Sequence, residues 1–309
     1  MPVRKIFIAG AGNVGSASAA FMAMKQLGNI YLYDILEDFS IGQAMDINQS
    51  LPYWNSDSRV TGCRSLDEME GADVVVITAG GKRTEGMTRL DLLYQNLDIM
   101  YDIGEKVMEL APGAFVHVTS NPVDVLTWAL KERWPDMNIT GLGCALDAMR
   151  FRFFLAEHLN VSREAVNCTV IGTHDDNMVP LVDRADVGGI PLRQHLTDID
   201  AERLVTLVKH GGGDIVKRLK TRSGFFAAAT KVTQIIESHL YNKQHIFPVS
   251  VMANGEYGYH DMALSLPTAI GERGVHEIFE FDLSDHERSM VDVCADSMKK
   301  VISEIRART

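Results

Sequence analysis

Two short segments of this 309-residue chain combine a carboxylate, a guanidinium and an imidazole in otherwise apolar surroundings. Asp147 and Arg150 are three residues apart, a spacing that places both on one face of a helix. His174 follows Gly172 and Thr173. An imidazole changes its charge near neutral pH, which suits it to proton transfer, and a guanidinium can bind a carboxylate through two parallel hydrogen bonds. The simpler interpretations are an ordinary i,i+3 ion pair and an unremarkable histidine.

A glycine cluster near the N-terminus has the pattern of a dinucleotide-binding turn. Gly10, Gly12 and Gly15 form G-x-G-x-x-G after an apolar run over 4–9. In such a turn the first glycine bends the chain, the second lets a pyrophosphate approach and the third allows close helix packing. Asp34 follows about 20 residues later, at the spacing of the ribose-binding carboxylate. Its charge would repel a 2′-phosphate, which favours NAD over NADP, although an Asp at a strand end can also cap a turn.

A further segment concentrates positive charge in this acidic chain. Between Lys82 and Arg89 there are three cations and one anion, directly after an apolar run over 72–78. A solvated loop is one interpretation, and a lid that recruits an anionic substrate is the other. Asn121, in Thr-Ser-Asn-Pro, ends the next apolar run, at the sheet edge where open α/β domains bind ligands.

These residues are spaced along a chain that alternates strands and helices in its first half. Near-continuous apolar runs at 4–9, 30–34, 72–78 and 114–120 are typical of a parallel sheet covered on both faces. Helical periodicity follows at 13–27 and over a long stretch at 89–110. The pattern predicts a doubly wound α/β domain.

The second half mixes short strands with longer helices. Strand signals lie at 165–171, 185–187, 246–252 and 263–269, and helices are expected at roughly 147–159, 200–210, 213–219 and 225–240. A capping box, Ser284 to Glu287, opens a last helix. We expect the two halves to pack closely around a cleft.

The composition excludes several classes of protein. Hydrophobic residues make up 46% and charged residues 23%, and 30 Lys+Arg against 41 Asp+Glu give a net charge of −11. This acidic balance disfavours a nucleic-acid partner. No apolar run reaches the roughly 18 residues of a membrane span, no signal peptide is recognisable, and the cysteines lack metal-ligand spacing. We expect a cytoplasmic protein without metal, membrane or nucleic acid.

The ordered motifs resemble those of the lactate/malate dehydrogenase family over essentially the whole chain. The motifs are the glycine fingerprint, the cationic loop, Ser-Asn-Pro, Leu-Asp-x-x-Arg and Gly-x-His. The resemblance implies an α/β fold with an N-terminal Rossmann domain, residues 1–144, and a C-terminal α+β substrate domain, residues 145–309. It also implies a homo-oligomer, either a dimer or a tetramer.

The resemblance further implies a role for each site residue. His174 would donate and accept the proton, Asp147 would orient its ring, and Arg150 would hold the α-carboxylate of the substrate. Three further residues would surround the substrate, namely Arg89 at its carbonyl, Asn121 near the nicotinamide and Ser223 opposite the loop. The implied NAD contacts are Gly10, Gly12, Asn13, Val14, Gly15, Asp34, Thr78, Ala79, Gly80, Asn96, Thr119 and Asn121.

Within the family, the residue at position 83 separates two substrates. Lactate dehydrogenases carry Gln there and malate dehydrogenases carry Arg, so Arg83 predicts pairing with the second carboxylate of oxaloacetate. The chain is most similar to the lactate-dehydrogenase-like malate dehydrogenases. A dehydrogenase of another 2-hydroxy acid such as lactate, an NAD-dependent glycosidase of related fold and a non-catalytic NAD-binding regulator are the alternatives.

Two positions depart from the family pattern. Glu85 replaces a proline of the loop, and Asp175 replaces the glycine after the catalytic histidine. A glycine there usually indicates a positive φ, which Asp tolerates better than most residues. We expect a positive φ at Asp175, and either a carboxylate that raises the pKa of His174 or one that points to solvent.

Overall fold

The first half of the chain builds the parallel sheet that the sequence predicts. The computed structural model describes residues 3–81 and 86–308, apart from the side chain of Arg89. The strands of this half are β1 (Lys5–Ala9), β2 (Asn29–Tyr33), β3 (Val60–Cys63), β4 (Val74–Ile77), β5 (Phe115–Val118) and β6 (Ile139–Gly141). They lie parallel in the order β3-β2-β1-β4-β5-β6. This is the Rossmann strand order, and it confirms the predicted fold class.

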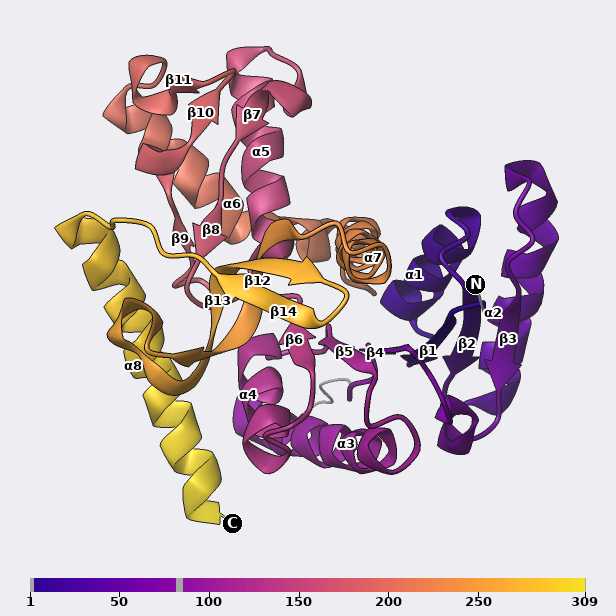
Figure 1. Ribbon diagram of the computed structural model, residues 1–309. Helices are drawn as coiled ribbons and strands as arrows, with labels where there is room; N and C mark the ends of the chain where they lie inside the picture. Colours follow the sequence, from indigo (N-terminus) through magenta and orange to yellow (C-terminus); the bar gives the residue numbers. More distant parts are fainter. Residues whose placement is uncertain (1–2, 82–85, 309) are drawn as a thin grey trace.

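Helices cover both faces of this sheet, which explains the unbroken apolar strands. The helices of the first half are α1 (Asn13–Met24), α2 (Glu37–Ser50), α3 (Arg89–Leu110) and α4 (Val123–Arg133). In Figure 1, α3 and α4 lie together on one side of the sheet, and α1 lies on the other side against α7 (Phe226–Leu240). All four residues of β4 and of β5 are buried as a result.

Strands from the second half extend the same sheet. They are β12 (His245–Asn254), β13 (His260–Gly271) and β14 (Gly274–Ile278). β12 pairs antiparallel with β6 through Ser250 and Gly141, and β13 and β14 follow as antiparallel neighbours. The result is one sheet of nine strands to which both halves contribute, so the halves pack closely, as expected.

The rest of the second half forms a lobe of its own, at the top of Figure 1. Its short strands are β7 (Val166–Asn167), β8 (Val170–Ile171), β9 (Val179–Pro180), β10 (Asp186–Val187) and β11 (Ile190–Pro191). Its helices are α5 (Ala145–Leu159) and α6 (Asp198–Leu219), which pack on each other. Phe151, Leu155 and Val208 belong to a second apolar core in this lobe, separate from the core under the large sheet.

Two expected boundaries in the second half are wrong. The strand expected over 165–171 is two strands in different sheets, because β7 pairs with β10 whereas β8 pairs with β9. The two helices expected at 200–210 and 213–219 are one helix, α6, which runs through Gly211, Gly212 and Gly213. Packing of α6 on α5 overrides the low helix propensity of glycine there.

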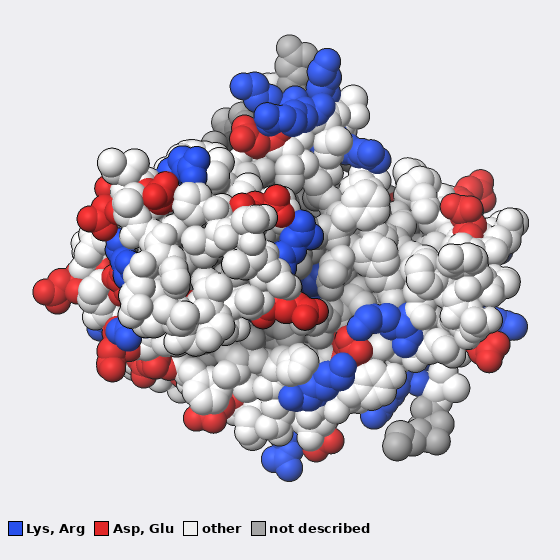
Figure 2. Space-filling view, turned by 90° about the horizontal axis from the view of Figure 1, so that it is seen from above, with Lys and Arg blue, Asp and Glu red and all other residues white. Residues whose placement is uncertain are grey.

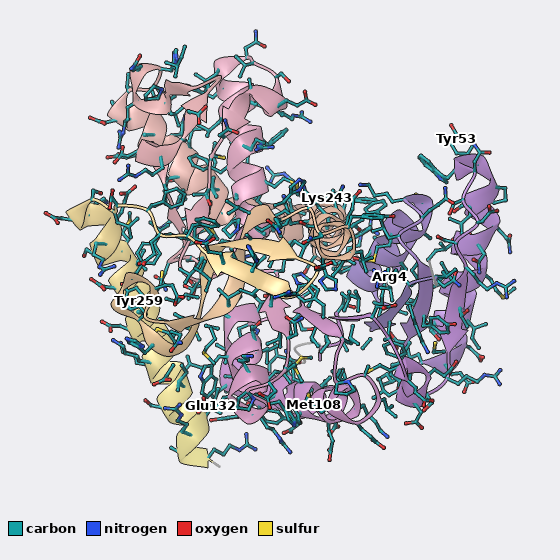
Figure 3. All side chains as sticks on the ribbon, in the orientation of Figure 1. Arg4, Tyr53, Met108, Glu132, Lys243 and Tyr259 are labelled. Carbon is teal, nitrogen blue, oxygen red and sulfur yellow. The ribbon has the colours of Figure 1, made fainter. Side chains whose placement is uncertain are left out.

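The last helix, α8 (Asp285–Arg308), is held to both halves of the chain. It begins with the predicted capping box, in which Ser284 Oγ accepts from Glu287 N and Glu287 Oε2 accepts from Ser284 N. Tyr259 donates a hydrogen bond of 2.6 Å to Asp292, and Arg306 pairs with Glu132 of α4 at 2.6 Å. Figure 3 labels Tyr259 and Glu132 beside this helix.

The surface agrees with the mixed charge of the sequence. On the face drawn in Figure 2, acidic and basic side chains are interspersed among uncharged ones. Within the parts of the chain that the structure describes, no helix is both long enough and apolar enough to cross a membrane.

Candidate active site

The glycine turn between β1 and α1 is shaped by close backbone contacts. Gly10 has a φ of +110°, and a Cβ added to it would lie 2.7 Å from the backbone nitrogen of Ala79. A Cβ added to Gly15 would lie 1.9 Å from the carbonyl oxygen of Gly10. A side chain at either position would therefore prevent this turn from forming.

The middle glycine of the turn faces open space instead. A Cβ added to Gly12 would meet nothing within 4 Å, and Gly12 precedes α1 without providing a side-chain cap. The first N–H groups of α1, from Asn13 and Val14 onward, thus form a helix N-terminus suited to an anion. This geometry fits the pyrophosphate of a dinucleotide.

Asp34 comes directly after β2 and stabilises the glycine turn through a hydrogen bond. Its Oδ2 accepts a hydrogen bond of 2.8 Å from Ala11 N, and its Oδ1 accepts one of 3.1 Å from Leu36 N. The structure therefore places this carboxylate beside the turn, where it also caps the backbone that follows. Its neighbour Ile35 is 86% exposed and supplies no cation.

The segments that follow β4 and β5 meet at the same edge of the sheet. Asn96, a buried residue of α3, accepts a hydrogen bond of 2.8 Å from Gly81 N and donates one of 2.7 Å to the carbonyl of Asn121. Thr78 Oγ1 donates to the carbonyl of Gly10 at 2.9 Å. Asn96 and Thr78 thus join the segments around Ala79, Gly80 and Asn121 to one another and to the glycine turn.

Thr119 adds an observation that points to a ligand at this edge. Its hydroxyl oxygen is buried and has no hydrogen-bond partner among the described residues. A buried polar group without a partner is unfavourable, and a ligand bound at this edge would provide the missing partner. The open helix N-terminus and this hydroxyl both fit a bound dinucleotide.

The structure brings His174, Asp147 and Arg150 together, as the sequence predicts. Asp147 is fully buried in the first turn of α5 and divides its two oxygens between its neighbours. Its Oδ2 lies 2.5 Å from Nδ1 of His174, and its Oδ1 accepts a hydrogen bond of 2.6 Å from Nη1 of Arg150. Because a carboxylate only accepts, Nδ1 of His174 carries a proton, and Nε2 is the nitrogen that can exchange one.

The surroundings of His174 favour its charged form. Burial by itself would lower the pKa of His174, but the charge and hydrogen bond of Asp147 outweigh burial and raise the pKa above its ordinary value. Asp124 contributes in the same direction, and Arg150 opposes it. An imidazolium held in this way can donate a proton to a developing alkoxide.

Asp124 is the residue of this site that sequence reasoning missed. It lies buried in the first turn of α4, and its Oδ2 accepts a hydrogen bond of 2.7 Å from the backbone N–H of His174. Its Oδ1 accepts from Ser265 Oγ at 3.2 Å, and Ser265 belongs to β13. A carboxylate among the apolar residues that begin the helix after Ser-Asn-Pro was the available signal.

Asp175 does not have the backbone that we expected. Its φ is not positive, and its exposed carboxylate accepts hydrogen bonds from Thr173 Oγ1 and Asn177 N within its own loop. The left-handed residue of this loop is Gly172, with a φ of +100°. The largest contributions to the pKa shift of His174 come from burial, Asp147, Asp124 and Arg150. Of the two expectations for its side chain, the solvent-facing one agrees with this geometry.

The remaining predicted substrate contacts are placed only in part. Arg83 and Glu85 lie outside the described residues, and Arg89 begins α3 behind a Thr88–Asp91 capping box, with its side chain outside the description. Ser223 is exposed between α6 and α7, and none of the described hydrogen bonds joins it to His174, Asp147 or Arg150. No cluster of three or more metal-ligating side chains occurs within residues 3–81 and 86–308.

Comparison with known proteins gives matches over nearly the whole chain. Residues 4–138 match the family described as lactate/malate dehydrogenase, NAD binding domain, and residues 144–309 match the corresponding alpha/beta C-terminal domain. Malate dehydrogenase from Thermoplasma acidophilum is 39% identical over 315 aligned positions, which cover 97% of each chain.

Solved structures agree with these matches. The apo malate dehydrogenase from Picrophilus torridus has a TM-score of 0.95 at 34% identity, over 99% of both chains. The lactate dehydrogenase from Eimeria maxima, solved with NADH and oxamate, has a TM-score of 0.95 at 32% identity, over 99% of this chain and 95% of that one. Structures of relatives named for either substrate thus have nearly the same fold as this chain.

Proposed function

The chain belongs to the lactate/malate dehydrogenase family, as an NAD-dependent 2-hydroxy-acid dehydrogenase, and on this premise we propose that its substrate pair is malate and oxaloacetate. The observation that carries the proposed chemistry is the sharing of Asp147 between His174 at 2.5 Å and Arg150 at 2.6 Å. This arrangement puts a proton donor beside a carboxylate-binding group, as the reduction of a 2-oxo acid requires.

The residues act on the substrate in complementary ways. A nicotinamide cofactor bound along the glycine turn would supply the hydride as NADH during reduction and would take it back as NAD+ during oxidation. His174 gives its proton to the oxygen during reduction and takes it back during oxidation, a contribution of roughly 10²–10⁴-fold. Asp147 fixes the tautomer of the ring and stabilises its charged form. Arg150 binds the α-carboxylate through its planar guanidinium, which can donate two parallel hydrogen bonds.

The choice of oxaloacetate rests on Arg83. The second carboxylate of oxaloacetate needs a cation when the site excludes water, because an unpaired buried charge is strongly unfavourable. Arg83 supplies that cation from the loop, Arg89 acts on the reacting carbonyl, and Ser223 contributes to the opposite wall of the pocket. The malate dehydrogenase names of the archaeal relatives support the same substrate.

The test compares two acids with one assay. We expect the purified protein to oxidise NADH with oxaloacetate at a kcat/KM at least ~10²-fold higher than with pyruvate, the size of effect for one unpaired carboxylate. A preference for pyruvate would make the protein a lactate dehydrogenase. NADH binding without turnover of either acid would support the regulator instead, and metal-dependent glycoside hydrolysis would support the glycosidase.

We also propose that each chain consists of two domains, residues 1–144 and 145–309, and that the protein is a homo-oligomer, either a dimer or a tetramer. The region of α2 and the turn after it exposes large apolar side chains: Phe39, Met45, Tyr53 and Trp54 are 44%, 58%, 83% and 50% exposed. Exposed apolar patches of this kind are typical of subunit interfaces. Light scattering that gave the mass of a single chain at micromolar concentration would contradict this proposal.

A further inference from the structure

Three consecutive glycines lie inside a long helix of the substrate lobe. Gly211, Gly212 and Gly213 are in the interior of α6, which runs without interruption from Asp198 to Leu219. Glycine is one of the poorest helix formers, because it has the most backbone freedom to lose. Three of them in one turn therefore need a reason other than helix formation.

The three glycines differ in how close they lie to Arg150, and this difference suggests why two of them are present. A Cβ added to Gly212 would lie 3.4 Å from Nη2 and 3.5 Å from Nη1 of Arg150. A Cβ added to Gly211 would lie 3.4 Å from Cδ of Arg150 and 3.6 Å from the ring of Phe154. A Cβ added to Gly213 would meet nothing within 4 Å. The first two glycines thus lie against Arg150, and the third does not.

Arg150 has hydrogen-bonding capacity that its present contacts do not use. Its Nη1 donates to Asp147, its Nε is buried without a partner among the described residues, and its side chain is 19% exposed. A guanidinium binds a carboxylate best with two parallel hydrogen bonds from adjacent nitrogens. Each terminal nitrogen carries two N–H groups, so Nη1 can donate to a second carboxylate while it keeps its bond to Asp147. A carboxylate that pairs with Nη1 and Nη2 in this way needs free space beside both nitrogens.

We propose that Gly211 and Gly212 are positioning residues for Arg150, because their missing side chains leave open the space through which the carboxylate of the substrate reaches its guanidinium. This inference rests on the proposed role of Arg150 in substrate binding. A methyl group at 212 would fit against the guanidinium as it now stands, in van der Waals contact with both terminal nitrogens. It would obstruct the approach of a carboxylate to those nitrogens.

The test uses the neighbouring glycine as a matched control. We expect Gly212→Ala to raise KM for oxaloacetate, and the Kd of the enzyme–NADH complex for oxamate, by about tenfold or more, the effect of losing one charge-assisted hydrogen bond. KM for NADH should not change. Gly213→Ala makes the same change in helix propensity without contacting Arg150, so it should keep the KM and Kd of the parent. Neither variant should have a lower Tm than the parent, because Ala favours helix.

A double-mutant cycle tests whether Gly212→Ala raises KM through its contact with Arg150 or through a general loss of flexibility in α6. In an Arg150→Lys background, which itself should raise KM, Gly212→Ala should add little, because the planar fork that it obstructs is gone. Gly211→Ala provides a second variant, with the same direction of change, if Gly212→Ala does not fold.

Several outcomes would overturn the inference. One is a folded Gly212→Ala variant with the same KM and Kd as the parent. A second is a Gly213→Ala variant that raises KM and Kd as much as Gly212→Ala does. A third is strictly additive effects of Gly212→Ala and Arg150→Lys in the double-mutant cycle. A parent enzyme that reduces oxaloacetate in preference to pyruvate keeps the proposed function whatever the glycine variants do. A parent that prefers pyruvate overturns the proposed substrate, and the glycine variants are then tested with pyruvate. A parent that reduces neither acid would overturn both proposals together.

Discussion

The backbone N–H of His174 donates a hydrogen bond of 2.7 Å to the carboxylate of Asp124, which is buried at the start of α4. His174 is thus held by two carboxylates, by Asp147 at its ring and by Asp124 at its backbone. Both oxygens of Asp124 accept hydrogen bonds, the second from Ser265, which is consistent with an ionised group. Burial raises the pKa of Asp124, and the hydrogen bond from His174 N opposes this shift.

Asp124→Asn should lower the pKa of His174. Asp124 is one of the charges that raise this pKa, and Asn keeps the size and an acceptor for the backbone N–H while it removes the charge. Reduction of oxaloacetate requires protonated His174, so its activity is lost as pH rises through that pKa. The upper midpoint of the kcat/KM profile should therefore move to lower pH, and by less than in Asp147→Asn, because Asp147 contributes more to the raised pKa.

Asp175→Asn is the matched control for this experiment. It removes one negative charge from the same loop, but Asp175 is exposed and its carboxylate accepts hydrogen bonds from Thr173 Oγ1 and Asn177 N within the loop. Its pH profile should coincide with that of the parent. Coincident profiles for Asp124→Asn and the parent would show that Asp124 contributes only to structure. An equal displacement by Asp175→Asn would favour the loop carboxylate instead.

Asp147→Asn should have a larger effect, because it removes the partner that makes the main favourable contribution to the charge of His174. We expect a loss of roughly 10²–10⁴-fold in kcat/KM for both directions of the reaction. The pKa of His174 should also fall, so the remaining reductase activity should persist only at lower pH. A second control is Asp183→Asn, which changes an exposed carboxylate that pairs with Arg193. Activity of Asp147→Asn within a few-fold of the parent would contradict the assigned role.

Much of this site could be predicted because its signals are local. The helix expected at 89–110 has the bounds that the structure gives α3, since the Thr88–Asp91 capping box fixes its start. Asp147 and Arg150 meet because three residues make almost one helical turn. Asp147 and His174 are 27 residues apart, and only the family resemblance predicted that they would meet.

The parts that could not be predicted depend on packing between distant segments. The pairing of Ser250 with Gly141, which extends the sheet into the second half, has no local signal in either strand. The same holds for the contact between Asp124 and His174, which are 50 residues apart. Gly211 to Gly213 indicated a break by propensity alone, but the packing of α6 on α5 decided otherwise.

Arg83→Gln should change the choice of substrate more than the rate of catalysis. Only oxaloacetate has a second carboxylate, so we expect its kcat/KM to fall by ~10²-fold or more, while that of pyruvate is maintained. Initial rates of NADH oxidation with each acid measure the ratio. Lys82→Gln removes a neighbouring loop cation as the control, and it should affect oxaloacetate much less. Equal and small losses for both acids would show that Arg83 is an ordinary surface cation.

Asp34 provides a final prediction, about the cofactor. Its carboxylate is fixed beside the glycine turn by Ala11 N, and the exposed Ile35 next to it adds no positive charge. A 2′-phosphate at this place would meet an uncompensated negative charge, and like charges that are placed together cost several kcal/mol. The double variant Asp34→Ser, Ile35→Arg removes the repulsion and supplies a partner for the phosphate. We expect the ratio of kcat/KM for NADPH to that for NADH to rise by about 10²-fold, since each 1.4 kcal/mol is a factor of ten.

The single variant Ile35→Arg is the control for this prediction. It keeps the carboxylate and should shift the ratio much less, so it separates the loss of repulsion from the gain of attraction. Because Asp34 also accepts the N–H of Ala11, the Tm of each variant should be measured beside its kinetics. A parent enzyme that uses NADH and NADPH equally well would show that Asp34 only caps the turn.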